Sequence, residues 1–474
     1  MSDRATSPEP TMNLSEPRRV HILGIGGSGM SAIAIVLAAQ GHTVTGSDAV
    51  ASPTLERLRA HGIDVRIGHA AENLPEALDI VMASTAIAPE NPEVIAAHAR
   101  DVPVWSRASG LAALTRVRRT LAVAGSHGKT TTASMLATIL EHGGQDPSYV
   151  IGGELRDRAN NAAWGAADLF VVEADESDGT FLDLDVDGTV VTNIEPDHLE
   201  HWGGFDAVIR AFDRYTRGMS GPVIVGVDDE HAARLDAVRR ADGLETTSYG
   251  FSPEADVVII NYRADGRTSS FSLQFPDAVV GPIAMTAPGR HNAQNAAGAA
   301  ALARAVGTPD DAIVSGLEAF GGVARRFQFR AEHDGVTFVD DYAHLPSEVA
   351  AAIATARAGG WNRVIVVFQP HRYSRTEALW STFADAFEGA DQLFLTDVYS
   401  AGEAPRPGVD GHLLVQAVLD AHPATPVIYL PGRAELLGVL RQRVRPGDLV
   451  LTLGAGDLTT LPDEWLEAVG EERP

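Results

Sequence analysis

Short apolar runs alternate with alanine-rich stretches of helical periodicity along most of the chain. The first series has an apolar run at residues 20–24, a helical stretch at 28–40 and a second apolar run at 42–46. Apolar strands that alternate with helices are typical of parallel sheets covered by helices. The pattern therefore predicts an α/β fold.

The series restarts twice, which indicates three domains. A second set of strands is predicted at residues 121–125, 168–175 and 188–194, and a third at 363–369, 392–397, 426–430 and 448–454. Residues 246–287 instead alternate short strands with Gly, Pro and Asp turns, which predicts an antiparallel insert, followed by helices up to residue 320. We place the domains at residues 18–118, 119–325 and 326–474, after a polar tail at 1–17 that is predicted to be disordered.

Composition narrows the classes of function. The 63 acidic residues outnumber the 37 basic ones and give a net charge of −26, so nucleic-acid binding is not expected. The absence of cysteine excludes disulfides, thiolate metal ligands and cysteine nucleophiles. Neither a signal peptide nor an apolar run of roughly 18 residues is found, so we expect a cytoplasmic protein without a membrane partner. The sequence does not indicate an oligomeric state.

A glycine-rich turn joins the first predicted strand to the first helix. In "HILGIGGSGM", Gly24, Gly26 and Gly29 form a G-x-G-x-x-G motif, whose missing side chains let the backbone approach a diphosphate at the helix N-terminus. Asp48 ends the next strand, where a partner for a ribose or a base is expected. The motif does not distinguish NAD from another nucleotide diphosphate, and a tight turn without a ligand is the structural alternative.

A second glycine loop, "GSHGKTTT" at residues 125–132, contains the only lysine of the chain, Lys129. Its position between a strand and a helix is that of a P-loop, in which backbone N–H groups cradle phosphates, Lys129 reaches the terminal phosphates and Thr130 binds Mg²⁺. The loop is shorter than the usual motif because residue 123 is Val, so its glycines are Gly125 and Gly128. A cation at a helix N-terminus is unfavourable without a bound anion, which favours ATP binding over an exposed surface lysine.

Acidic residues follow the next two predicted strands. "VVEADESDGTF" provides Glu173, Asp175, Glu176 and Asp178, and "VVTNIEPDHLEHW" provides Asn193, Glu195, Asp197 and His198. The carboxyl ends of parallel strands gather ligand groups, and oxygen ligands with one imidazole suit Mg²⁺ that bridges nucleotide phosphates. We therefore predict a Mg²⁺ site here, with solvated acidic loops as the alternative.

Polar loops later in the chain offer further ligands. His291, Asn292 and Asn295 begin an alanine-rich helix, where they can cap the helix or face an adenine. Arginines in two loops can clamp a carboxylate or stabilise phosphate charge, although each alone is more often a surface residue: Arg325, Arg326, Arg372 and Arg375.

Together these motifs resemble the Mur ligase family, which forms amide bonds in peptidoglycan precursor synthesis at the expense of ATP. The resemblance extends from about residue 20 onward, and within the family it is to the MurC branch, which adds L-alanine to UDP-N-acetylmuramate. Its residues are "HILGIGGSGMSAIA", "GSHGKTTT", "VVEADESDGTF", "NIEPDHLEHW", "PGRHNAQNAAGA", "RRFQ", "DDYAHLP", "FQPHRYSRT" and "GAGDL". It implies Rossmann-like first and third domains and a P-loop-type central ATPase domain with a mixed sheet.

The resemblance also implies a division of labour among the domains. The first would hold the UDP-sugar through Gly26, Gly27, Ser28, Gly29, Asp48, Ser84, Thr85 and Arg107. The central domain would bind Mg-ATP through Gly125, Ser126, His127, Gly128, Lys129, Thr130 and Thr131, with Thr130, Glu173 and His198 at the metal and His291, Asn292 and Asn295 near the adenine. The third would bring Arg326 and Asp341 to ATP, and His344, His371, Arg372, Tyr373 and Arg375 to the substrate, which His198 would also contact. The implied catalytic residues are Lys129, Glu173, His198, Arg326, His344, Arg372 and Arg375.

The implied reaction transfers a phosphoryl group from ATP to the lactyl carboxylate of UDP-N-acetylmuramate, which gives an acyl phosphate and ADP. The amine of alanine then attacks the acyl phosphate through a tetrahedral intermediate and releases phosphate. Three features depart from the family pattern. Ser126 replaces a threonine, which keeps the hydroxyl, and Leu345 replaces the second histidine of D-Y-A-H-H-P. The carbamylated lysine of several other Mur ligases cannot form, because Lys129 is the only lysine.

Three alternatives remain open from the sequence. The nearest is the recycling ligase that attaches a whole peptide to UDP-muramate, and "FQPHRYSRT" favours the single-alanine enzyme over it. A Rossmann NAD-dependent dehydrogenase would leave the loop around Lys129 unexplained. A non-catalytic UDP-sugar-binding protein would not need that lysine.

Overall fold

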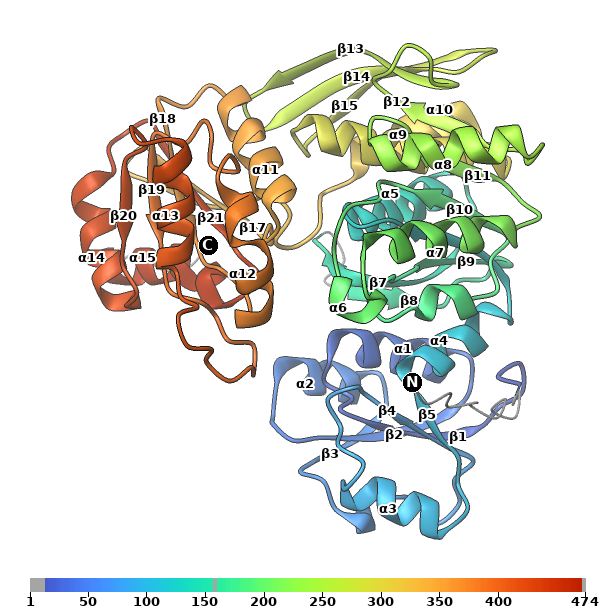
Figure 1. Ribbon diagram of the computed structural model, residues 1–474. Helices are drawn as coiled ribbons and strands as arrows, with labels where there is room; N and C mark the ends of the chain where they lie inside the picture. Colours follow the sequence, from blue (N-terminus) through green and yellow to red (C-terminus); the bar gives the residue numbers. More distant parts are fainter. Residues whose placement is uncertain (1–12, 157–159, 471–474) are drawn as a thin grey trace. The chain divides into compact units, whose positions relative to one another are not determined.

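The computed structural model describes residues 13–156 and 160–470, which form three sheets flanked by helices (Figure 1). The chain divides into two compact units. One comprises Met1–Ile260, Leu273–Gly281 and Gln294–Ala319, and the other comprises Asn261–Ser272, Pro282–Ala293 and Phe320–Pro474. Within the described ranges, no helix is long and apolar enough to cross a membrane.

The first sheet is parallel throughout, with the strand order β3-β2-β1-β4-β5. Its strands are β1 (Arg19–Leu23), β2 (Thr43–Asp48), β3 (Asp64–Ile67), β4 (Ile80–Ala83) and β5 (Val104–Ser106). The helices of this part are α1 (Ser28–Ala39), α2 (Pro53–Ala60), α3 (Pro92–Ala99), α4 (Arg107–Thr115) and the 3-10 helix η1 (Ala71–Asn73). The strand order reverses between β1 and β4, so a ligand is expected at the carboxyl ends of these strands.

Residues 1–12 of the predicted disordered tail lie outside the described residues. Within the remainder of that tail, Leu14 is buried, and its carbonyl oxygen lies 3.2 Å from His42 Nε2. Leu14 therefore belongs to the apolar core of the first sheet.

The central sheet has ten strands in the order β15-β14-β13-β12-β11-β10-β6-β9-β7-β8. They are β6 (Arg119–Ala124), β7 (Ser148–Leu155), β8 (Asn160–Ala163), β9 (Leu169–Glu173), β10 (Gly188–Val191), β11 (Val223–Gly226), β12 (Thr247–Gly250), β13 (Val257–Asp265), β14 (Thr268–Gln274) and β15 (Val279–Met285). The helices are α5 (Lys129–His142), α6 (Leu199–Trp202), α7 (Phe205–Arg217), α8 (Glu230–Ala241), α9 (Arg290–Ala305), α10 (Asp310–Ala319) and the 3-10 helix η2 (Thr180–Asp183). The sheet is mixed, as predicted, because β7 pairs in parallel with β9 and antiparallel with β8.

The predicted antiparallel insert is only partly correct. Its first strand, β12, pairs in parallel with both β11 and β13, so it continues the parallel sheet. A strand of four residues is too short for its hydrophobic pattern to show this. The next strands, β13, β14 and β15, are neighbours joined at residues 266–267 and 275–278, and such short connections permit only antiparallel pairing.

The third sheet has the order β16-β17-β21-β18-β19-β20 and is parallel except for its edge strand β16. Its strands are β16 (Gln328–His333), β17 (Val336–Asp341), β18 (Arg363–Phe368), β19 (Gln392–Leu395), β20 (Val427–Tyr429) and β21 (Asp448–Leu453). The helices are α11 (Pro346–Ala358), α12 (Tyr373–Leu379), α13 (His412–Ala421), α14 (Arg433–Arg443), α15 (Leu461–Val469) and the 3-10 helices η3 (Trp380–Phe383) and η4 (Asp457–Thr460).

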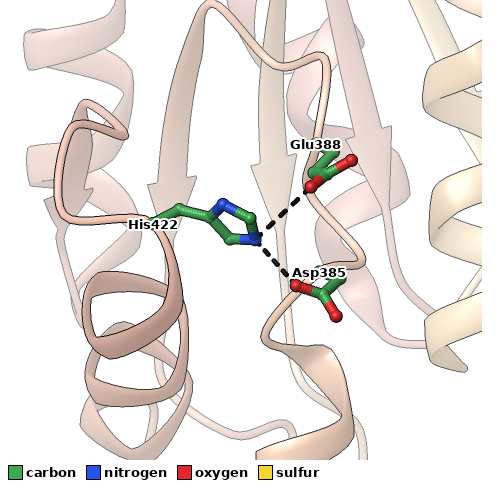
Figure 2. A group of neighbouring side chains, drawn as sticks. All are labelled: Asp385, Glu388 and His422. Atoms are coloured by element: carbon green, nitrogen blue, oxygen red, sulfur yellow. Dashed lines mark hydrogen bonds and ion pairs between the residues drawn. The ribbon is translucent and has the colours of Figure 1, made fainter.

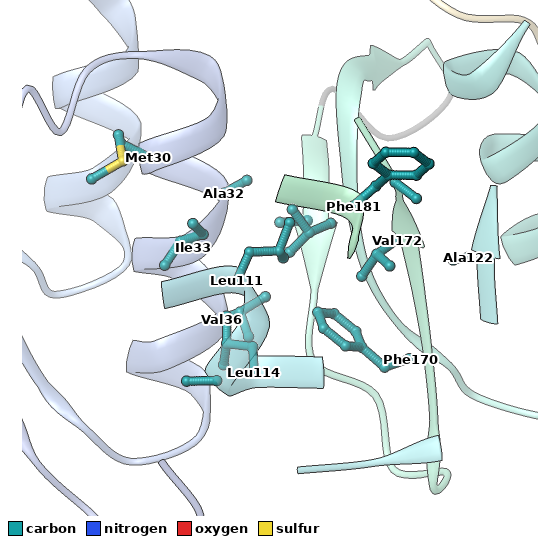
Figure 3. Packing of buried hydrophobic residues seen from close by; sticks show 14 of the residues in the cluster. Met30, Ala32, Ile33, Val36, Leu111, Leu114, Ala122, Phe170, Val172 and Phe181 are labelled. Carbon is teal, nitrogen blue, oxygen red and sulfur yellow. The ribbon is translucent and has the colours of Figure 1, made fainter. Parts of the chain in front are cut away.

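A continuous apolar cluster joins the first sheet's helices to the central sheet (Figure 3). Val36 of α1 and Leu114 of α4 belong to the same buried cluster as Phe170 and Val172 of β9. Burial of such side chains contributes roughly 1.5–3 kcal/mol each. The first two sheets therefore share one core within their unit.

Candidate active site

The loop between β6 and α5 contains two glycines that other residues would replace only with strain. Gly125 has φ of +130°, and a Cβ there would lie 2.0 Å from Thr192 Oγ1. Gly128 has φ of +80°, and its Cβ would lie 2.4 Å from Asn295 Oδ1. The loop thus packs closely on its neighbours and ends at the N-terminus of α5, where backbone N–H groups favour an anion.

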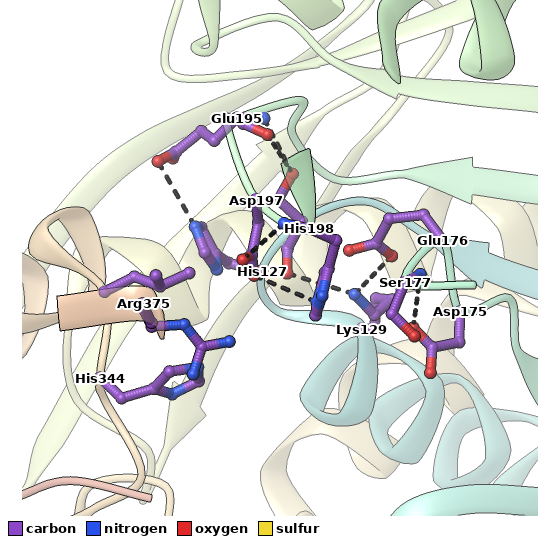
Figure 4. Close-up of polar contacts among 12 residues, drawn as sticks. His127, Lys129, Asp175, Glu176, Ser177, Glu195, Asp197, His198, His344 and Arg375 are labelled. Carbon is purple, nitrogen blue, oxygen red and sulfur yellow. Dashed lines mark hydrogen bonds and ion pairs between the residues drawn. The ribbon is translucent and has the colours of Figure 1, made fainter. Parts of the chain in front are cut away.

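Lys129, the first residue of α5, has three acceptors around its ammonium group. Its Nζ donates to the carbonyl oxygens of Gly125 at 2.6 Å and Ser126 at 3.2 Å, and to Glu176 Oε2 at 2.7 Å (Figure 4). Burial opposes the charge on Lys129, but the carboxylates of Glu176 and Asp175 outweigh it and raise the lysine's pKa. A charged ammonium is therefore fixed inside the glycine loop.

Glu173, the last residue of β9, lies beside the helix that Lys129 begins. Thr130 Oγ1 donates to Glu173 Oε2 at 3.2 Å, and the backbone N–H of Gly152 donates to Oε1 at 2.6 Å. Burial raises the pKa of Glu173. The structure thus brings together a hydroxyl and a carboxylate, two oxygen ligands that suit Mg²⁺.

The loop after β10 is hydrogen bonded to the loop that contains Lys129. The two loops are adjacent because they follow β10 and β6, which are parallel neighbours. Ser126 Oγ accepts from the backbone N–H of Glu195 at 2.8 Å, and Asn193 Oδ1 accepts from that of His127 at 2.8 Å. The same loop carries His198, which has the left-handed φ of +52° and ends the stretch before α6. A role of His198 at the metal stays a prediction.

The glycine-rich turn after β1 is held by Asp48. The backbone N–H of Gly26 donates to Asp48 Oδ2 at 2.8 Å, and a Cβ on Gly26 would come equally close to that oxygen. A Cβ on Gly29 would lie 3.2 Å from Arg107 Cδ. Asp48 and Arg107 therefore surround the turn, and Asp48 braces it, a role that the sequence did not predict.

Asn161 on β8 was not predicted as a site residue. It is buried, and its Nδ2 donates to the carbonyl oxygen of Ser28, the first residue of α1, at 3.1 Å. A second link runs from Arg107 at the start of α4 to Asp175, 3.6 Å apart. No motif in "RANNAAWG" signals the contact of Asn161, because its partner lies 133 residues away.

In the second unit, His371 lies among other predicted site residues. Its ring centroid is 6.0 Å from that of His344, and its Nδ1 is 3.2 Å from Arg375 Nη1. Tyr399, which was not predicted, stacks on it with centroids 5.8 Å apart. Burial and then the charge of Arg375 lower the pKa of His371 to about 4, so its imidazole is neutral at pH 7.

Arg372 precedes helix α12 with a strained backbone. Its φ is +67°, and its backbone N–H donates to the carbonyl oxygen of Tyr399 at 2.8 Å. Backbone strain of this kind persists where the surrounding structure holds it, commonly at functional sites. Arg372 is exposed and directly precedes Tyr373, the first residue of α12.

Arg326, His291 and Asp341, the residues expected near ATP, form a second group in this unit. Burial and then the charge of Arg326 lower the pKa of His291 to about 4. Burial raises the pKa of Asp341 to about 6, although Arg326 opposes the shift and two backbone N–H groups donate to the carboxylate. The charge of Arg326 thus acts to lower the pKa of both His291 and Asp341.

The remaining predicted residues are placed as follows. Asn292 is buried, and its Nδ2 donates to the carbonyl oxygen of Pro288 at 2.7 Å, so this contact does not cap a free N–H of α9. Asn295 faces Gly128, while Thr131 is buried within α5. Ser84 and Thr85 directly follow β4, and a Cβ on Gly24 would lie 3.0 Å from Ser84 Cβ. That these residues contact a ligand stays a prediction.

The lowered pKa of His291 predicts a loss of stability in mild acid. A histidine that resists protonation when folded stabilises the protein fully above its unfolded pKa of about 6.5 and loses that contribution as the pH falls towards 4. We expect His291→Asn to remove roughly 1–3 kcal/mol of this pH dependence. Melting temperatures of wild type and variant at pH 7.5 and 5.0 measure it. Exposed His98→Asn is the control, and an unchanged pH dependence in His291→Asn would contradict the prediction.

Three domain models of one protein family match successive parts of the chain. They are "Mur ligase family, catalytic domain" at residues 19–119, "Mur ligase middle domain" at 123–303 and "Mur ligase, glutamate ligase domain" at 325–456. The chain belongs to the Mur ligase family. This confirms the family predicted from the motifs.

Named relatives within the Mur ligase family are similar over nearly the whole chain. UDP-N-acetylmuramate–L-alanine ligases of Bradyrhizobium sp. (strain ORS 278) and Solidesulfovibrio magneticus are each 44% identical, over 95% of this chain and 98% of theirs. The crystal structure of UDP-N-acetylmuramate-alanine ligase MurC from Thermotoga maritima has a TM-score of 0.79 at 27% identity, covering 95% of this chain and 99% of that one. A murein peptide ligase from Psychrobacter arcticus shares the fold, with a TM-score of 0.68 at 24% identity, covering 96% and 100%. The predicted three-domain α/β fold is thereby confirmed.

Leu345, where the Mur ligase motif usually has a second histidine, is buried next to the start of α11. The backbone N–H groups of His344 and Leu345 both donate to Glu348 Oε2, at 3.0 and 3.2 Å. An apolar side chain needs no hydrogen-bond partner, so leucine suits this buried position. His344 alone is therefore available as an imidazole in this segment.

A separate polar group in the second unit was not predicted from the sequence (Figure 2). His422 Nε2 lies 2.7 Å from Asp385 Oδ1 and 3.5 Å from Glu388 Oε1. Among the described residues it is the one group of three potential metal ligands, but its two carboxylate side chains are 81% and 68% exposed. Exposed ion pairs of this kind contribute little to stability, and nothing further in the structure marks a bound ion.

Proposed function

We propose that this chain joins L-alanine to the lactyl carboxylate of UDP-N-acetylmuramate at the expense of ATP, in peptidoglycan precursor synthesis. The observation that carries the proposal is the 44% identity, over 95% of the chain, to relatives named UDP-N-acetylmuramate–L-alanine ligase. The glycine loop that fixes the charged Lys129 supports it, since ligation through an acyl phosphate needs a phosphate-binding loop.

We assign one role to each part of the chain. Residues 18–118 bind the UDP-sugar, with its diphosphate at the turn of Gly26 and Gly29. Residues 119–325 bind ATP, and residues 326–474 bind the amino acid. The turn braced by Asp48 supports the first assignment, because it leaves the N-terminus of α1 to an anion.

Phosphoryl transfer depends on positioning and charge. Backbone N–H groups of residues 125–130 cradle the ATP phosphates, and the charged Lys129 ammonium in the same loop neutralises the terminal phosphates. Thr130 and Glu173 fit Mg²⁺, because a hydroxyl and a carboxylate lie 3.2 Å apart, with His198 as a further ligand. Bound Mg²⁺ would supply charge neutralisation on the phosphates.

The amino acid is assigned to the group around His371. Arg372 and Arg375 are suited to pair with the carboxylate of alanine, since guanidinium binds carboxylates in a bidentate manner. The neutral imidazole of His371 accepts from Arg375 at Nδ1, so its Nε2–H is a donor that can face the carboxylate of alanine. His344 lies beside it and supports the same pocket. Arg326 and Asp341 are assigned to ATP.

A substrate panel tests the proposed function. ADP release is measured with UDP-N-acetylmuramate, ATP and Mg²⁺, offering alanine, glycine, serine or the L-Ala–D-Glu–diaminopimelate tripeptide. We expect alanine to give the highest kcat/KM, by about tenfold over glycine, because burial of one methyl group is worth roughly 1–3 kcal/mol.

Other outcomes of the panel identify the alternatives. A higher rate with the tripeptide would establish the recycling ligase instead. NADH binding without ATP binding would favour a dehydrogenase, and UDP-sugar binding without ADP release would favour a non-catalytic binding protein.

A further inference from the structure

One buried carboxylate of the first sheet's domain has no part in the chemistry described above. Glu93, near the start of α3, is 0% exposed and accepts hydrogen bonds from three other segments. Its donors are His21 Nε2 at 2.8 Å, Ser47 Oγ at 2.9 Å, Asn73 Nδ2 at 2.9 Å, the Ala70 backbone N–H at 3.1 Å and His69 Nδ1 at 3.2 Å. A single carboxylate therefore connects β1, β2 and the segment after β3.

The ionisation state of Glu93 determines what its partners do. Burial opposes its ionisation, but hydrogen bonds from His21, Asn73 and Ser47 outweigh burial and lower its pKa to about 2. At neutral pH the carboxylate is charged and accepts hydrogen bonds only. The hydroxyl hydrogen of Ser47 is directed to Glu93, which leaves a lone pair of Ser47 Oγ for another donor.

This arrangement fixes the hydrogen on the His69 ring. His69 Nδ1 lies 3.0 Å from Ser47 Oγ and 3.2 Å from Glu93 Oε1, so it is surrounded by acceptors and carries a hydrogen. In the neutral ring, Nε2 is then the acceptor. Over the described residues, no protein group hydrogen bonds to Nε2, and the side chain is 17% exposed. His69 therefore offers one acceptor to a ligand.

His69 stands at the edge of the sheet where a nucleoside is expected. It follows β3, whose last residue Ile67 pairs with Asp48, the residue that braces the glycine turn. In doubly wound sheets the diphosphate binds at the first turn, and the nucleoside extends over the ends of the neighbouring strands. Two apolar side chains, Val50 and Ile67, are exposed at the ends of β2 and β3, where they suit the face of a base.

We propose that Glu93 is a positioning residue that holds His69 as an acceptor for the N3–H of uracil. The inference rests on the proposed function, in which this domain binds a UDP-sugar. Uracil offers a donor at N3, whereas cytosine has an acceptor at that atom. The carboxylate acts through His69, since it is itself buried away from any ligand.

Glu93→Gln is a suitable variant because it keeps the shape of the side chain. Its amide oxygen must face the Ala70 N–H, which can only donate, so the amide NH₂ faces Ser47 Oγ. The Ser47 hydroxyl then loses its carboxylate acceptor and competes to donate to His69 Nδ1, while the amide oxygen still accepts from that nitrogen. The hydrogen on Nδ1 is therefore no longer fixed, and Nε2 is an acceptor for uracil only part of the time.

Calorimetric titration of the full chain with UDP, N3-methyl-UDP and 2′-deoxy-UDP tests the inference. We expect wild type to bind UDP about tenfold more tightly than N3-methyl-UDP, which lacks the N3–H. His69→Ala should weaken UDP binding about tenfold, remove this preference and raise KM for the UDP-sugar while kcat is kept. Glu93→Gln should change UDP binding and KM in the same direction by a smaller factor. Exposed Glu72→Gln, with the same change of charge in the same segment, should behave as wild type.

The outcomes separate this inference from the proposed function. Retention of the UDP preference in His69→Ala, or its absence in wild type, would overturn the inference alone. If His69→Ala instead loses the discrimination against 2′-deoxy-UDP, His69 contacts the ribose, and the inference is also overturned. Failure of wild type to bind UDP at all, with Mg-ATP binding intact, would overturn the proposed function itself.

Discussion

Replacement of Lys129 by alanine is expected to lower ADP release by at least about 10³-fold with UDP-N-acetylmuramate and alanine. The ammonium group is fixed within the glycine loop by two carbonyl oxygens and Glu176, and its pKa is raised, so it stays charged at every working pH. No other side-chain amine exists in the chain to replace it. Steady-state ADP release measures the effect.

The Lys129→Ala variant also leaves Glu176 as an unpaired buried carboxylate, which is destabilising in itself. The pair Lys129→Met with Glu176→Gln removes both charges and keeps similar volumes, so it should fold. We expect it to remain inactive while it binds UDP normally, since the first sheet is untouched. Activity within tenfold of wild type in this double variant would contradict the role of Lys129.

Lys129→Arg tests shape rather than charge. A planar guanidinium is larger than an ammonium and presents its donors in a fixed fork. The space between the Gly125 and Ser126 carbonyls suits the smaller group. We expect a loss of more than about 10²-fold in kcat/KM, and wild-type activity would show that the loop accepts either cation.

Gly125→Ala is expected to have the second largest effect. The backbone φ of +130° strains any residue with a side chain, and the new Cβ would lie 2.0 Å from Thr192 Oγ1 and 3.0 Å from the Asn193 carbonyl oxygen. Because these atoms hold the loop after β10, both predicted phosphate-site loops must move. We expect the free energy of unfolding to fall by about 2–4 kcal/mol. We expect ATP binding to weaken by more than about 10²-fold.

Gly144→Ala provides the matched control, because Gly144 has φ of +72° but no atom within 4 Å of its added Cβ. It has a left-handed backbone without a close contact, so its cost should be only about 1 kcal/mol and ATP binding should be retained. Denaturant unfolding and nucleotide titration compare the two variants. Equal behaviour of both would show that the close contact of Gly125 is unimportant.

The parts of the fold and site that the sequence predicted are those with local signals. The two glycine loops combine strand, turn and helix patterns within about twenty residues, so Gly26 and Lys129 could be placed from the sequence alone. Strand β12 was assigned to the wrong kind of pairing because four residues carry no decisive period. Local sequence patterns thus predict helices and strands better than they predict which strands pair and in which direction.

Contacts between distant segments were not predictable in this way. Asn161 reaches Ser28 across 133 residues, and Glu93 accepts hydrogen bonds from three segments, none of which carries a recognisable motif. Tyr399 was missed because an exposed tyrosine in a loop is common, and only its stacking on His371 marks it. The roles of His198, Arg326 and His344 remain predictions from the family resemblance.

The single lysine has a consequence for the chemical labelling of this protein. Reagents that acylate amines need the neutral, accessible form of a lysine. Lys129 is only 15% exposed, and its raised pKa keeps it protonated. Amine-directed cross-linkers and dyes should therefore leave the folded side chains almost unmodified. Any acyl group that does attach to a side-chain amine would sit in the phosphate loop, so labelling would directly report how often that loop opens.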